Sequence, residues 1–103
     1  MKNGTVAIGD ASLHIGYSQV VEPSQRGFVR EITEFFVPEP QRGKGQGTAL
    51  LTDVCEQADQ DRIMLIIIAD NARLQSFYIR HDFITIQDEP VILMMRNPVE
   101  VAQ

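Results

Sequence analysis

The sequence contains no tryptophan, one cysteine (Cys55) and two histidines. A single cysteine cannot form an intramolecular disulfide, and one cysteine with two histidines cannot supply the four ligands of a closed zinc site. No resident metal is therefore expected. The shortage of cysteine fits a protein of the reducing cytoplasm, which is the location that the sequence predicts.

Positive charge is scarce as well. Lysine and arginine together number 9, against 14 aspartate and glutamate residues, and the formal net charge is −5. Sequence-independent binding to nucleic acid or to an anionic membrane requires clustered positive charge, so neither partner is expected. No apolar run approaches the roughly 18 residues of a membrane-spanning helix. The first residues, MKNGTVAIGD, also lack the apolar segment of a signal peptide.

The remaining composition is that of an ordinary globular protein. Hydrophobic residues make up 44% of the sequence and charged residues 22%. A chain of 103 residues has room for one hydrophobic core, and it contains no repeat, low-complexity tract or long linker. The sequence therefore predicts a single domain that spans residues 1–103.

The spacing of apolar residues predicts the order of the secondary structure. Period-two alternation indicates strands at Thr5–Gly9, Ser12–Val21 and Phe28–Val37. From Thr48 to about Asp59 the period changes to that of a helix, because apolar residues recur at helical spacing. This helical face consists of Leu51, Val54, Cys55 and Ala58.

The second half of the chain predicts a buried strand, a second helix and a hairpin. The run Ile63–Ala69 is apolar on both faces and is expected to be covered on both sides. Asp70 or Asn71 can cap the helix that follows. The apolar face of this helix would consist of Leu74, Phe77, Tyr78 and His81, and the hairpin strands would be Phe83–Gln87 and Val91–Arg96.

A glycine-rich segment, RGKGQG at residues 42–47, lies between the third predicted strand and the first predicted helix. Free backbone N–H groups and the positive end of the helix dipole meet at such a junction, and glycines let an anion approach the main chain. The segment therefore predicts a phosphate or pyrophosphate site. A tight turn without a ligand is the alternative. The spacing fits neither a P-loop nor a dinucleotide-binding fingerprint.

The spacing R-x-x-G-x-G, formed by Arg42, Gly45 and Gly47, resembles the GNAT superfamily of acyl-CoA N-acyltransferases. The resemblance extends over EITEFFVPEPQRGKGQGTALL and NARLQSFYIRHDF, in the family's order and at its usual separation. It covers about half the chain. Asp82 stands where the family usually has glycine, which suggests a differently shaped turn. The customary proline is displaced, with Pro38 and Pro40 on either side of its place.

The resemblance implies an α/β (α+β) fold of the GNAT type: a mixed, mostly antiparallel sheet with helices on both faces. Only a short segment precedes the second-strand-like segment, so the chain resembles a member truncated at its N-terminus, like the short acetyltransferases of phages and mobile elements. The acceptor side is then expected to be open, or to be completed in a homodimer. Met94 and Met95 lie on opposite faces of the last predicted strand, which also favours a homodimer.

The resemblance also implies acetyl-CoA as cosubstrate and a protein lysine as the most plausible primary-amine acceptor. A non-catalytic CoA-binding or protein-interaction module is the alternative. Asn71 corresponds to a cofactor-contacting asparagine, with a plain helix cap as the alternative. The full set of implied cofactor-binding residues is Phe35, Phe36, Val37, Arg42, Gly43, Lys44, Gly45, Gln46, Gly47, Thr48, Asn71 and Tyr78.

Two residues are implied to act in direct acetyl transfer. Glu31 occupies the general-base position, with Glu34 as the alternative, because alternate residues of a strand face opposite sides and only one of the two would face the cleft. Tyr78 occupies the general-acid position, with a core tyrosine as the alternative. His14 and Cys55 are expected to be structural, and His81 is expected to interact with a helix dipole.

Overall fold

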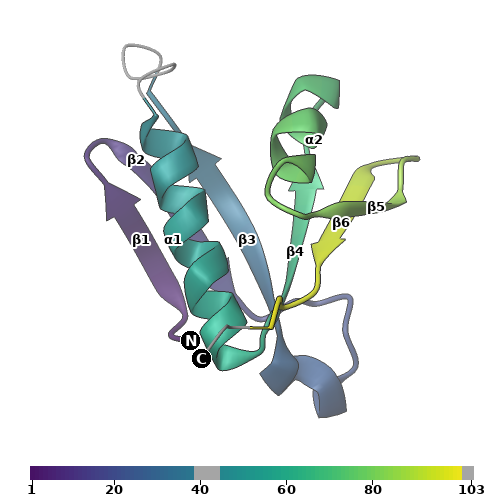
Figure 1. The fold of residues 1–103 in the computed structure, drawn as a ribbon. Coiled ribbons are helices and arrows are strands. Elements are labelled where there is room, and N and C mark those ends of the chain that lie inside the picture. The colour runs from purple at the N-terminus through teal and green to yellow at the C-terminus, as the bar shows by residue number, and fades with distance from the viewer. Residues whose placement is uncertain (39–44, 101–103) are drawn as a thin grey trace.

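The computed structural model describes residues 1–38 and 45–100. These residues form one six-stranded sheet in the order β1-β2-β3-β4-β6-β5, with two α-helices and one 3-10 helix (Figure 1). No helix in these two ranges is long and apolar enough to cross a membrane. The elements are β1 (Gly4–Ile8), β2 (Ala11–Gly16), η1 (Pro23–Phe28), β3 (Val29–Phe36), α1 (Gln46–Asp61), β4 (Met64–Ala69), α2 (Ala72–Ile79), β5 (Ile84–Gln87) and β6 (Ile92–Arg96).

The strand pairing confirms a mixed, mostly antiparallel sheet. Only β3 and β4 run parallel, joined by the crossover helix α1, and every other neighbouring pair is antiparallel. The predicted order of strands and helices is also confirmed.

Both α-helices pack on the same face of the sheet, which we call the helix face. Residues paired across the sheet mark this face: Ile15 pairs with Ile32, Ile32 with Ile67, and Ile67 with Met94. All four belong to one buried cluster with Leu51 and other residues of α1 and with Tyr78 of α2. The sequence predicted helices on both faces. The structure differs because the crossover helix and the helix after β4 share a side.

The other side of the sheet, which we call the opposite face, carries Glu31, Ile66, Ile68 and Met95 in the same register. Ile66 is buried, but Ile68 is 46% exposed, and Ile84 and Ile86 of β5 are 57% and 51% exposed. The expectation that the Ile63–Ala69 run would be covered on both sides is therefore wrong at Ile68. The homodimer stays a prediction.

The second strand ends at Gly16, so the predicted strand Ser12–Val21 is wrong beyond that residue. The chain turns instead, and the amide of Val20 donates a hydrogen bond to the Ser18 hydroxyl. Such local side-chain bonds offer the backbone an alternative to sheet pairing. Farther on, the guanidinium of Arg30 donates to Asn3 Oδ1 (2.7 Å) and stacks on Tyr17 (4.5 Å to the ring centre). Arg30 thereby joins this segment to the edge of the sheet.

The turn after α2 has Asp82 in the left-handed conformation, with φ of 71°. Glycine adopts this conformation most easily, and aspartate is among the few other residues that tolerate it. The amides of Asp82 and Phe83 donate back to the carbonyls of Ile79 and Tyr78. Asp82 therefore adopts a backbone conformation that glycine would adopt easily, and the expectation of a differently shaped turn stays a prediction.

A buried ion pair joins α1 to β6. Arg96 is 4% exposed and forms a two-pronged contact with Asp59, at 2.6 and 3.0 Å. Arg96 Nε also donates to the carbonyl of His81, and Asp59 accepts from the amide of Val99. Burial alone would raise the pKa of Asp59, but the hydrogen bonds from Arg96 and Val99 outweigh it and lower that pKa. The pair therefore ties α1, the end of α2 and β6 together.

We expect Asp59→Asn to lower the free energy of unfolding by about 2 to 3 kcal/mol, because it removes the nearer carboxylate from a buried guanidinium and leaves the exposed Asp82, 3.9 Å away. Asp53→Asn is the matched control, since Asp53 is exposed on the same helix. Urea denaturation at pH 7 measures both. Because the pKa of Asp59 is lowered in the folded protein, its contribution is complete above about pH 4 and is lost as the pH falls further. The parent and Asp59→Asn should therefore differ less in free energy of unfolding in acid. A loss no larger than that of Asp53→Asn would contradict this role.

Candidate functional site

A gap opens in the sheet where β3 and β4 separate. Their parallel pairing covers only four residues of each strand and ends at Ile32 and Ile67. Beyond this point β3 continues beside β2 as far as Phe36, and β4 continues beside β6 as far as Ala69. Figure 1 shows the two strands diverging toward their carboxyl ends. The starts of α1 and α2 lie at the same end of the sheet.

A β-bulge at Glu34 shapes the wall of this gap. Glu34 has φ of 52°, and two residues of β2, Ser12 and His14, pair with residues of β3 that are three positions apart, Phe36 and Thr33. The extra residue breaks the alternation of side chains. Glu31 and Glu34 consequently both line the same cavity. The expectation that only one of them could face the cleft is therefore wrong.

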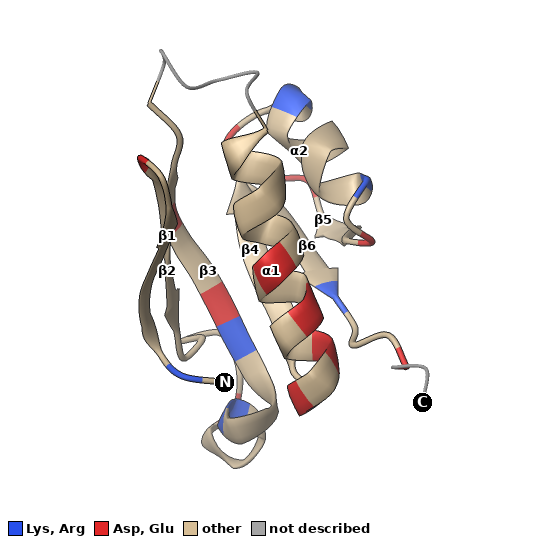
Figure 2. Cartoon of the chain, turned by 60° about the vertical axis from the view of Figure 1, so that its left-hand side comes forward, with Lys and Arg blue, Asp and Glu red and all other residues tan. Residues whose placement is uncertain are grey.

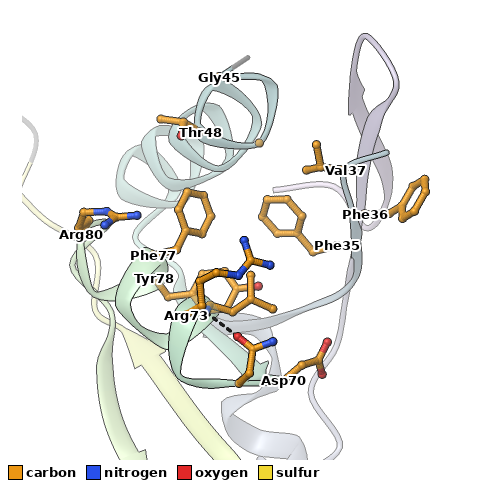
Figure 3. Close-up of a pocket in the computed structure, with 13 residues that line it drawn as sticks. Phe35, Phe36, Val37, Gly45, Thr48, Asp70, Arg73, Phe77, Tyr78 and Arg80 are labelled. Carbon is orange, nitrogen blue, oxygen red and sulfur yellow. Dashed lines mark hydrogen bonds between the residues drawn. The ribbon is translucent and has the colours of Figure 1, made fainter. Parts of the chain in front are cut away.

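A cavity of about 580 Å³ lies between the end of β3, the start of α1 and α2. Its size is within the range of small-molecule sites. Most residues that the sequence predicted for cofactor binding line it. Figure 3 shows Phe35, Thr48, Phe77 and Tyr78 around the cavity, whereas the side chain of Phe36 points away from it. The predicted residues that line the cavity are Phe35, Phe36, Val37, Gly45, Gly47, Thr48, Asn71 and Tyr78.

The start of α1 suits an anion. Gly45 is the N-cap, in the left-handed conformation with φ of 82°, and it provides no side-chain cap for the first amides of the helix. The first seven residues of α1 include no acidic residue, and the other nine include Asp53, Glu56, Asp59 and Asp61. Figure 2 shows this separation along the helix. The positive end of the helix dipole therefore faces the cavity without a competing carboxylate from the first turns of α1.

Four of the predicted cofactor residues are placed elsewhere or not described. Gln46 does not line the cavity, and its side chain lies over Gly9 in the turn between β1 and β2. Arg42, Gly43 and Lys44 fall outside the described residues. At Gly47, by contrast, the backbone packs closely, because an added Cβ atom would lie 3.0 Å from Val37 Cγ2. The start of α1 is therefore held directly against the end of β3.

The second helix contributes three polar groups to the same cavity. Asn71 is the N-cap of α2, and its Oδ1 accepts from the amide of Leu74 at 2.9 Å. This bond leaves the N–H donors of its side-chain amide for other partners. Arg73 and Arg80 also line it, and Figure 3 shows Arg73 directed between Phe35 and Phe77. The two arginines were not predicted, although Arg73, Phe77 and Arg80 have the i, i+4, i+7 spacing of one helix face.

Tyr78 lies at the inner end of the cavity and is only 3% exposed. Its ring contacts those of Phe35, Phe77 and Phe83, with centroids 5.6 to 6.3 Å apart. Burial, with a smaller contribution from the Asp70 carboxylate, raises the pKa of Tyr78 to about 12. The phenol is therefore a neutral hydrogen-bond donor at physiological pH.

A second, smaller cavity of about 270 Å³ lies in the gap between β3 and β4. Glu31 and Glu34 line it together with Ile68. Four residues line both cavities: Phe35, Asp70, Leu74 and Tyr78. Asp70 was not predicted as a site residue, although its place directly after a buried strand is a typical position for a functional side chain. The two cavities thus meet at Tyr78: the larger has two arginines beside the shared Asp70, and the smaller has Glu31 and Glu34 beside it.

The remaining titratable candidates lie outside both cavities. Burial, Arg80 and Arg96 lower the pKa of His81, so its ring is neutral near pH 7 and packs edge-on against Phe77. The lowered pKa does not favour the predicted interaction of His81 with a helix dipole, which stays a prediction. Burial raises the pKa of Cys55 to about 11, as expected for an inert core thiol. The described ranges contain no cluster of three or more metal-ligating side chains.

A family model described as "Acetyltransferase (GNAT) family" matches residues 2–83. No curated protein matches the sequence.

Several solved structures share the fold. Tetrahymena GCN5 superposes with a TM-score of 0.72 at 14% identity, over 95% of this chain and 69% of that one. Escherichia coli ElaA superposes with a TM-score of 0.65 at 26% identity, over 84% of this chain and 60% of that one. The PaiA N-acetyltransferase from Thermoplasma acidophilum, in complex with coenzyme A, superposes with a TM-score of 0.64 at 14% identity. The match covers 84% of this chain and 52% of that one. The chain thus spans between half and about two thirds of the length of these proteins.

The raised pKa of Tyr78 predicts a specific loss of stability in alkali. A phenol whose pKa is higher in the folded than in the unfolded protein contributes stability below the ordinary value near 10, and this contribution is lost as the pH rises toward 12. The full effect is roughly 3 kcal/mol. We expect Tyr78→Phe to lose less stability than the parent between pH 9 and 11, measured by urea denaturation. An equal loss in both proteins would mean that Tyr78 titrates normally.

Proposed function

Because the chain belongs to the GNAT family of acetyltransferases, we propose that it transfers an acetyl group from acetyl-CoA directly to a primary amine, a lysine side chain of a protein. The observation that carries this proposal is the meeting of the two cavities at Tyr78. One cavity has the groups that an anionic cosubstrate requires, and the other has the carboxylates that an amine requires. The cytoplasmic location and the homodimer stay predictions.

The larger cavity fits the chemistry of CoA. The phosphates of CoA need positive charge and free amides. The cavity has the start of α1, without a side-chain cap, on one side and Arg73 and Arg80 on the other. The pantetheine arm of CoA needs an apolar wall, which Phe35 and Phe77 provide. Acetyl-CoA would supply an activated thioester at the inner end. GNAT-fold proteins bind CoA, as the PaiA complex illustrates.

The smaller cavity fits a protonated amine. A lysine amine with a pKa near 10.4 must lose a proton before it can attack, at a cost of roughly 4 to 5 kcal/mol at pH 7. A carboxylate beside the amine can attract the cation and accept this proton. We assign this role to Glu31, which is half-buried on regular strand, rather than to Glu34, which is exposed on the bulge.

Tyr78 would act on the leaving sulfur. In acetyl transfer the amine nitrogen forms a bond to the acetyl carbon, and the carbon–sulfur bond breaks to leave a thiolate. Full proton transfer from a phenol of pKa about 12 to a thiolate of ordinary pKa near 8.5 would cost roughly 5 kcal/mol. Burial that raises the pKa of the phenol also raises that of a thiolate beside it, which reduces this cost. Tyr78 therefore donates a hydrogen bond to the sulfur first and a proton once the thiolate forms.

Direct transfer follows from the arrangement of the cavities. Since the two cavities share four lining residues, both reactants can be present beside Tyr78 at the same time. Of the described nucleophiles, Cys55 is buried with its pKa raised, which makes an acylated cysteine on the protein unsuitable as an intermediate.

The assignment of the larger cavity predicts that Arg73→Gln and Arg80→Gln each weaken acetyl-CoA binding by about tenfold, the usual effect of losing one charge-assisted contact. Calorimetry at low and at physiological salt measures the affinity. Arg62→Gln is the matched control, because this substitution removes the same charge at the far end of α1. Unchanged affinity in both variants would remove these arginines from the site.

The assignment of the smaller cavity predicts that Glu31→Gln lowers turnover by roughly 10²- to 10⁴-fold while acetyl-CoA affinity is unchanged. Release of free thiol from acetyl-CoA with poly-L-lysine as acceptor gives the rate, and intact mass shows the added acetyl groups. Glu34→Gln is the control and should lose much less activity. A larger loss in Glu34→Gln would exchange the two assignments. A folded parent protein that binds acetyl-CoA without turnover would support the non-catalytic alternative.

A further inference from the structure

The turn after β2 places one fully buried hydroxyl against the proposed base. Ser18 is 0% exposed, and its hydroxyl donates a hydrogen bond to Glu31 Oε1 at 3.2 Å. Ser18 lies in the segment where the sequence predicted a continued strand, and it reaches Glu31 only because the strand ends at Gly16. Gly16 itself pairs with Glu31 in the sheet.

A second hydrogen bond fixes the direction of this hydroxyl. The amide of Val20 donates to Ser18 Oγ at 3.3 Å. Because that contact occupies a lone pair of the oxygen, the hydroxyl proton is left to point toward the carboxylate. The backbone of Glu31 is held at the same time by β2 on one side and by Ile66 of β4 on the other. Both the main chain and the side chain of Glu31 are therefore constrained.

Glu34 has no comparable support. It is exposed, lies on the bulge with φ of 52°, and has no hydrogen bond or ion pair to its side chain within residues 1–38 and 45–100. A carboxylate that must accept a proton at a defined place gains from a fixed rotamer, since a free rotamer spends much of its time elsewhere.

We propose that Ser18 is a positioning residue that holds the Glu31 carboxylate toward the acceptor cavity. This inference rests on the proposed function, in which Glu31 accepts the proton of the amine. Ser18 acts through Glu31 alone, because it lines neither cavity. Its hydroxyl remains bonded throughout and exchanges no proton with the amine.

The test is a double-mutant cycle with Ser18→Ala and Glu31→Gln. Ser18→Ala should lower kcat with poly-L-lysine by about 3- to 10-fold, the effect of one hydrogen bond, and leave the KM for acetyl-CoA unchanged. In the Glu31→Gln background the same substitution should have no further effect on kcat. Equal factors in both backgrounds would overturn the proposal, because they would show that Ser18 acts independently of Glu31.

Three further variants separate positioning from stability. Thr85→Val removes a hydroxyl that accepts from Gln75 at 2.9 Å, far from Glu31 in the fold, and should leave kcat unchanged. Ser18→Thr keeps the hydroxyl but adds a methyl group at a fully buried position, so it should lower stability and still retain kcat near that of the parent. If Ser18→Ala does not fold, Ser18→Cys preserves the size of the side chain with a much weaker donor and should show the same loss of kcat.

The outcomes distinguish this inference from the proposed function. A parent protein that binds acetyl-CoA but transfers no acetyl group would overturn both. A parent protein that is active, with Ser18→Ala and Ser18→Cys equal to it in kcat, would overturn only the role of Ser18. A loss of kcat in Ser18→Thr as large as that in Ser18→Ala would do the same, since the rate would then follow packing and not the hydroxyl.

Discussion

The short parallel pairing between β3 and β4 determines where every part of the candidate site lies. These strands are hydrogen-bonded over Val29–Ile32 and Met64–Ile67 only. Each then follows a different neighbour, so their carboxyl ends move apart while remaining in one sheet. Ligand sites in open sheets lie where neighbouring strands lead in different directions. Here the gap receives the start of one helix, the face of another and two carboxylates from β3.

Because the gap separates the sheet into β1-β2-β3 and β4-β6-β5, other contacts must hold the two parts together. Helix α1 packs against strands of both parts and shares one buried cluster with them. The Arg96–Asp59 pair connects this helix to β6 and to the end of α2. The distance between the cavity walls is therefore set by contacts at the far end of α1 as well as by the pairing of the strands.

Much of this arrangement could be predicted from the sequence. Periodicity was sufficient to predict the order of the elements. The two segments that resemble the GNAT superfamily were sufficient to predict that Gly45, Gly47, Thr48 and Tyr78 line one site. The side of the sheet on which each helix packs depends on how the chain crosses over the sheet, and no local pattern contains this information.

The bulge could not have been predicted either. Positive φ is uncommon outside glycine, asparagine and aspartate, so a glutamate such as Glu34 gives no sign of it in the sequence. Ser18 was missed for a related reason, since the alternating pattern continues past Gly16 although the backbone does not. Arg73 and Arg80, in contrast, could have been found from helical spacing alone.

The division of the sheet into a helix face and an opposite face has a consequence for how this chain can diverge. The strand residues of the main buried cluster, such as Leu13, Ile32 and Met94, lie on the helix face, which also borders the larger cavity. The exposed positions of the opposite face, such as Thr5, Ile68 and Ile84, can be exchanged at small cost in stability. Substitutions on the opposite face can therefore change the surface around the smaller cavity while the buried cluster that borders the larger cavity is retained.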